Sequence, residues 1–76
     1  MKAYQCYKEY PAESADVTIY VLDNSRFYPK IVVEFFGKDP LAEPFSRKWC
    51  DSVIEGIGIA EEYIKEQDFK KVIEIA

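Results

Sequence analysis

The 76-residue sequence contains no histidine, the side chain that enzymes use most often as a general base and that often ligates transition metals. Its two cysteines, Cys6 and Cys50, lie far apart in the chain and form no Cys-x-x-Cys motif of the kind that holds zinc or an iron–sulfur cluster. We therefore predict a protein that is not an enzyme and that has no catalytic residue, no cofactor and no metal site.

Glycine is scarce, with three residues, and long hydrophobic runs are missing. Gly56 and Gly58 lie in a helical pattern, without the preceding strand and third glycine of a dinucleotide-binding loop. No apolar stretch approaches the roughly 20 residues that cross a membrane, and the first residues lack the apolar core of a signal peptide. We expect a cytoplasmic protein with no membrane partner.

Aromatic and acidic residues, by contrast, are abundant. The chain is 49% hydrophobic and 16% aromatic, which is typical of a sequence that folds. Its length suffices for one hydrophobic core and not for two, so residues 1–76 are predicted to form a single domain. The net charge of −4 opposes attraction to a phosphate backbone, and we expect no direct contact with nucleic acid.

Alternating apolar and polar residues predict three strands in the first half of the chain, at residues 2–10, 16–22 and 30–36. Polar turn residues between the second and third segments predict an antiparallel hairpin. One face of this hairpin is uniformly apolar, and we expect a helix to cover it. The residues of this face are Val17, Ile19, Val21, Ile31, Val33 and Phe35.

The period changes after Pro44, where apolar residues recur at spacings of three and four and predict one long amphipathic helix over residues 44–66. Ser52, Gly56 and Ala60 form a strip of small residues along it. We favour close packing of this strip against a bulky strand residue or the C-terminal segment, and a helix–helix contact between two copies is the alternative.

The last segment, residues 69–76, has periodicities of both a strand and a helix, and its β-branched Val72, Ile73 and Ile75 favour the strand. The predicted fold is therefore α+β. A small antiparallel sheet of three strands, or four with the last segment, packs on one long amphipathic helix in the order β-β-β-α-(β).

Two surfaces are candidates for binding a partner. The outer face of the sheet carries Tyr20, Val32 and Phe36 and is more apolar than a solvated face needs to be. Four carboxylates fall within a narrow arc of the predicted helix and form an acidic ridge, which suits docking to a basic protein surface. The alternative for this ridge is a solvated polar face. Its residues are Asp51, Glu55, Glu62 and Glu66.

Cys50 would lie in the first turns of the predicted helix, next to Lys48, where a positive environment lowers the pKa of a thiol. A buried, unreactive cysteine is the reading we favour, because free cysteines are among the most buried residues. A disulfide between Cys6 and Cys50 is the less favoured alternative to two free thiols.

The surplus of apolar and acidic surface, without a catalytic constellation, predicts a small acidic protein–protein interaction module of adaptor or inhibitor type. Short acidic α+β proteins of this kind are found among phages and mobile elements, where they act on host nucleic-acid-processing or defence proteins. The first alternative is a homodimeric structural protein, and the second is a thiol-dependent small enzyme or redox protein. A nucleic-acid binder would have to concentrate its charge at Arg26, Lys30, Arg47 and Lys48.

Overall fold

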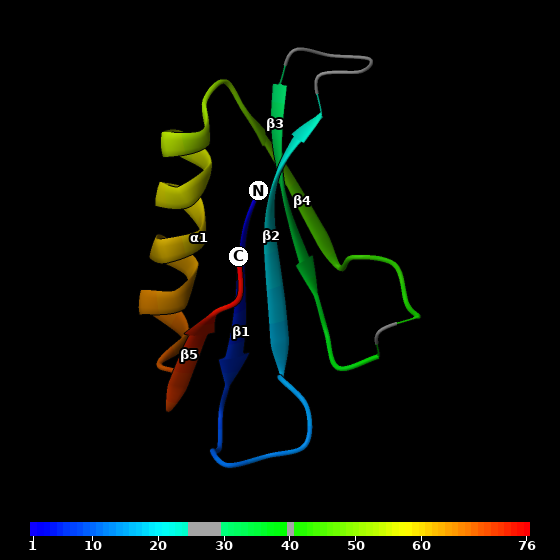
Figure 1. Ribbon diagram of the computed structural model, residues 1–76, viewed down its shortest axis with the longest axis vertical. Coiled ribbons are helices and arrows are strands. Elements are labelled where there is room, and N and C mark those ends of the chain that lie inside the picture. The colour runs from blue at the N-terminus through cyan, green and yellow to red at the C-terminus, as the bar shows by residue number, and fades with distance from the viewer. Residues whose placement is uncertain (25–29, 40) are drawn as a thin grey trace.

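The computed structural model describes residues 1–24, 30–39 and 41–76. They form five antiparallel strands in one sheet and a single helix on one face of it (Figure 1). In chain order the elements are β1 (Lys2–Tyr7), β2 (Val17–Asn24), β3 (Lys30–Phe36), β4 (Ser46–Cys50), α1 (Val53–Gln67) and β5 (Lys71–Glu74). The strands follow one another across the sheet as β4-β3-β2-β1-β5.

The α+β class and the final strand are confirmed, whereas the predicted start of the helix is wrong. Ser46–Cys50 is not helical but forms β4, which pairs with β3 from Ile31 opposite Cys50 to Phe35 opposite Ser46. The observed order is therefore β-β-β-β-α-β, with one strand more than the largest number predicted. Pairing with β3 is a tertiary interaction, and it overrides the helical spacing that joins Trp49 to Val53.

Ser52 starts the helix. Its side chain accepts a hydrogen bond from the backbone N–H of Glu55 at 3.1 Å, and the Glu55 carboxylate accepts one from the backbone N–H of Asp51 at 3.1 Å. This Ser-x-x-Glu arrangement closely resembles a capping box, which satisfies N–H groups that have no partner inside the helix. Asp68 ends the helix in the left-handed conformation, with φ 53°.

The core lies between α1 and the inner face of the sheet. All six residues predicted for the inner face of the β2–β3 hairpin are buried, and Cys6 and Tyr4 of β1 extend the same layer. Ala60 is fully buried on the helix. A Cβ atom built on Gly56 would lie only 2.8 Å from Cγ1 of Val21, so Gly56 and Ala60 of the predicted strip pack against the strands as favoured, whereas Ser52 precedes the helix and is exposed.

The connection between β1 and β2 is held by Asp16. Its carboxylate accepts a hydrogen bond from the backbone N–H of Lys8 at 2.7 Å and lies 3.4 Å from Nζ of Lys38. The backbone N–H of Asp16 donates to the carbonyl of Cys6 at 2.9 Å. These bonds place residues 8–16 next to the outer face of the sheet, where they border the candidate site. Within the described ranges, no helix is long and apolar enough to cross a membrane.

Candidate interaction surface

The outer face is the side of the sheet opposite α1, and alternation along the strands determines which residues it carries. The register places Thr18 opposite Phe36, Tyr20 opposite Glu34, and Leu22 opposite Val32, all on this side. β4 adds Arg47 and Trp49, which pair with Glu34 and Val32. In the part of the chain that the structure describes, no helix covers this face (Figure 1).

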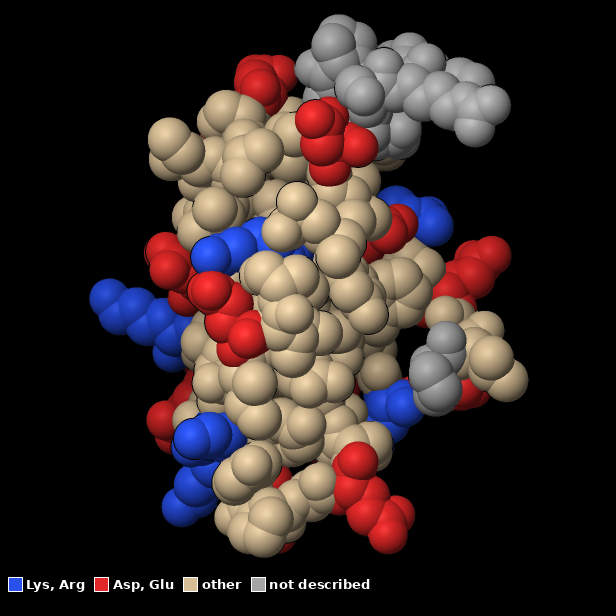
Figure 2. All heavy atoms as spheres, viewed as in Figure 1, with Lys and Arg blue, Asp and Glu red and all other residues tan. Residues whose placement is uncertain are grey.

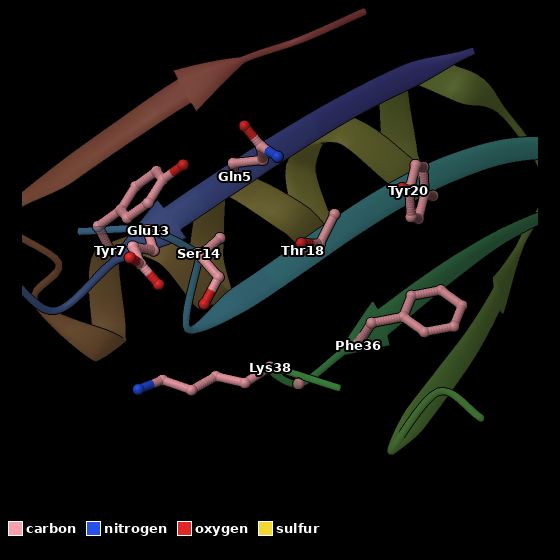
Figure 3. Close-up of a pocket in the computed structure, with 10 residues that line it drawn as sticks. Gln5, Tyr7, Glu13, Ser14, Thr18, Tyr20, Phe36 and Lys38 are labelled. Carbon is pink, nitrogen blue, oxygen red and sulfur yellow. The ribbon is translucent and has the colours of Figure 1, made fainter. Parts of the chain in front are cut away.

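Tyr20 and Phe36 form an aromatic pair at the centre of the outer face. Their ring centroids are 5.6 Å apart with an interplanar angle of 83°, an edge-to-face geometry that is favourable for aromatic rings. Beside them lies a hollow of about 400 Å³, shown in Figure 3, bordered by polar side chains that include Gln5, Ser14 and Thr18. The connection between β1 and β2 forms one wall of this hollow.

A second hollow of about 520 Å³ lies on the same face, beside Trp49. Its polar wall is an ion pair in which Nε of Arg47 donates to a Glu34 carboxylate oxygen at 2.7 Å. Trp49 keeps 50% of its surface exposed, whereas Val32 beneath the face keeps only 4%. Of the three outer-face residues predicted from the sequence, Tyr20 and Phe36 are therefore accessible, and Val32 forms the floor.

The acidic ridge is brought together only in part. Glu55, Glu62 and Glu66 line a groove of about 550 Å³ between α1 and β4, whereas Asp51 lies before the helix and does not line it. The remaining lining residues are Phe35, Lys48, Gly58, Ile59 and Tyr63. This groove is on the same side of the sheet as α1, so it is separate from the outer face.

Charged side chains of both signs are interspersed on the face seen in Figure 2. No basic patch gathers there among the residues that are drawn in colour. Arg47, a candidate for phosphate contact, is paired with Glu34 instead. Arg26, another candidate for phosphate contact, lies outside the described residues.

Both cysteines are free thiols and are buried. Burial raises the pKa of the Cys6 thiol to about 11, and burial followed by the Glu55 carboxylate raises the pKa of the Cys50 thiol. The buried reading of Cys50 is confirmed. The less favoured alternative, a thiol whose pKa is lowered at a helix start, is wrong because Cys50 ends β4 and lies outside α1.

The two thiols cannot form an intramolecular disulfide in this fold. β2 and β3 lie between β1 and β4, which separates Cys6 from Cys50 by three strand spacings, or about 14 Å. A disulfide needs Cα atoms within about 7 Å of each other. Within residues 1–24, 30–39 and 41–76, no group of three or more Cys, Asp or Glu side chains is arranged to hold a metal ion.

Sequence reasoning missed two parts of the surface. Trp49 falls within the predicted helix over residues 44–66, and Ser46–Cys50, with three polar residues followed by two apolar ones, has no alternation that would indicate a strand. Glu13, Ser14 and Lys38 form the polar wall of the hollow beside Tyr20 and Phe36. The position of this wall depends on how the connection between β1 and β2 folds back, which the local sequence pattern does not indicate.

Comparisons with protein-family models, with curated proteins and with solved structures find no match for this chain.

Proposed function

We propose that this protein is a small protein–protein interaction module, of adaptor or inhibitor type, that contacts its partner through the outer face of the sheet. The observation that carries the proposal is the aromatic centre of this face. Tyr20 and Phe36 are only half-buried, Trp49 is half-exposed, and no described helix lies over them.

Leaving an apolar surface of this kind in water is unfavourable. An antiparallel sheet is stable with one solvated face, but polar residues then usually occupy it. Aromatic side chains and arginine contribute most of the binding energy in many protein interfaces. Here Trp49, the Tyr20–Phe36 pair and Arg47 lie on neighbouring strands of one surface, with a hollow on either side of the pair.

The acidic charge supports a partner with a basic surface. The chain has a net charge of −4, and complementary charge accelerates association and selects among partners. Within this class we propose an inhibitor or adaptor that acts on a host nucleic-acid-processing or defence protein. The support for this narrower proposal is analogy with short acidic proteins of mobile elements.

The test is affinity capture followed by a binding measurement with purified components. Tagged protein is used to recover specific partners from a lysate of source or host cells, and the partner is then purified. Phe36→Ala and Trp49→Ala are each expected to raise Kd by about tenfold or more, as for hot-spot residues. Ile54→Ala is the matched control, because Ile54 is 84% exposed on α1, on the other side of the sheet.

Equal affinity of all three variants and the wild type would contradict the proposal. Failure to recover any specific partner, together with a stable dimer in light scattering, would instead support the homodimeric structural protein.

A further inference from the structure

β4 forms one edge of the sheet. It pairs with β3 on one side, and no described strand lies along its other side. An open edge of this kind presents backbone N–H and C=O groups to which an extended segment of another protein can add as a strand. The five residues of β4 offer about 17 Å of edge for such pairing.

The groove between α1 and β4 opens beside this edge. α1 follows β4 in the chain after Asp51 and Ser52, and in Figure 1 the two elements are joined at one end and spread apart toward the other. The floor is apolar. Its apolar lining comes from Phe35, Ile59 and Tyr63, and the ring centroid of Phe35 lies 4.8 Å from that of Tyr63.

The charge of the groove favours a basic occupant. Three carboxylates and one ammonium group line it, and neither Glu62 nor Glu66 forms an ion pair with another described residue. These two residues are one helical turn apart, a rise of about 6 Å. Alternate side chains of an extended strand are separated by a similar distance, about 6.7 Å.

Gly58 leaves the α1 side of the groove open to another backbone. Glycine weakens a helix relative to alanine, and the packing of the described residues does not require it at this position. A Cβ atom built on Gly58 would meet no described atom within 4 Å, in contrast to the crowded site at Gly56. Gly58 also lines the groove, where a missing side chain allows another backbone to approach α1.

We propose that the groove between α1 and β4 binds an extended, lysine- or arginine-bearing segment of a partner protein, which adds to β4 as a further strand. Its basic side chains, at alternate positions, point into the groove and meet Glu62 and Glu66, with their aliphatic stems against Ile59 and Tyr63, while the residues between them face the other side of the sheet. This second contact surface lies on the opposite side of the sheet from the outer face. Peptide binding in the groove can therefore be tested independently of partner binding at the outer face.

The test is an NMR titration of the full chain with a pool of peptides of about nine residues, carrying Lys or Arg at alternate positions and Val, Thr or Phe between them. We expect saturable shifts of amide signals in β4 and in the groove side of α1. Glu62→Gln should weaken binding by about fivefold or more at low salt. Glu61→Gln is the matched control, since it removes the same charge from a neighbouring residue that does not line the groove.

Two further measurements separate strand addition from general charge attraction. Gly58→Ala should weaken binding of the peptide while leaving the chain folded. N-methylation of alternate peptide amides should abolish binding, because it removes the hydrogen bonds between the peptide and β4. The proposal is overturned by an absence of saturable shifts, by equal weakening in Glu61→Gln and Glu62→Gln, or by full binding of the methylated peptides. A dimer formed through β4 would show that the occupant is a second copy, which also overturns it.

Discussion

Adding one methyl group at each of two helix glycines should have different effects on stability. Gly56 and Gly58 lie two positions apart in α1, and alanine at either position gains about 1 kcal/mol of helix propensity. At Gly58 nothing in the described structure opposes this gain, because no atom lies within 4 Å of the new Cβ position. Gly58→Ala should therefore stabilise the fold by about 1 kcal/mol.

At Gly56 the new methyl group meets a packed core. Its Cβ would lie 2.8 Å from Val21 Cγ1, 3.2 Å from Ile31 Cγ2 and 3.3 Å from Cys50 Sγ. Val21 is 2% exposed and belongs to a central strand, so it has little room to retreat. Overpacking of this kind costs about 1–3 kcal/mol, which cancels or exceeds the gain in propensity.

The difference between the two variants isolates the packing cost, because the propensity term is the same in both. Gly56→Ala should be less stable than Gly58→Ala by about 1–3 kcal/mol in urea unfolding, with an unchanged m-value. In thermal unfolding each kcal/mol corresponds to about 4–8 °C in Tm for a domain of this size. If Gly56→Ala proved as stable as Gly58→Ala, the close approach of α1 to β2 would be refuted.

Three further predictions concern a cap, a loop and a thiol. Ser52→Ala should lower the free energy of unfolding by about 1 kcal/mol because it removes the N-cap of α1, whereas Ser46→Ala should lower it less. The reverse order in urea unfolding would indicate that the helix begins at residues 44–46. The Lys8 backbone N–H, followed by Lys38, lowers the pKa of Asp16. The stabilisation by Asp16 is therefore complete above the unfolded-state pKa of this carboxyl and is lost as the pH falls through its folded-state pKa. Between pH 7 and pH 3 the wild type should lose more free energy of unfolding than Asp16→Asn. Equal losses in the two proteins would contradict this prediction. Since burial raises the pKa of Cys6 to about 11, its thiol should react with a disulfide reagent at pH 8 only after unfolding, and equally fast labelling of the native protein would contradict the burial.

The parts of the fold that follow from alternation could be predicted from the sequence. The β2–β3 hairpin and its inner face depend on a period of two, which survives in the structure, and the final strand followed from the β-branched residues of the last segment. β4 could not be predicted in the same way, because Trp49 and Val53 also satisfy a helical spacing. The local signal against the longer helix was Ser52 followed by Glu55 at the capping positions.

The candidate surfaces were likewise predicted only in part. Spacing along one helix correctly placed Glu55, Glu62 and Glu66 together, but Asp51 was included only through the helix boundary error. Alternation assigned Val32 to the outer face, yet its burial depends on neighbouring strands that the sequence does not order. The use of either surface for binding stays a prediction.

Hydroxyl-radical footprinting of the complex with the captured partner tests the central claim most directly, because it reads the side chains of the outer face. Tyr20, Phe36 and Trp49 should lose most of their reactivity when the partner binds, while the exposed Ile54 on α1 keeps its own. Unchanged modification of all three aromatic residues in the complex would contradict the proposal that this face binds the partner.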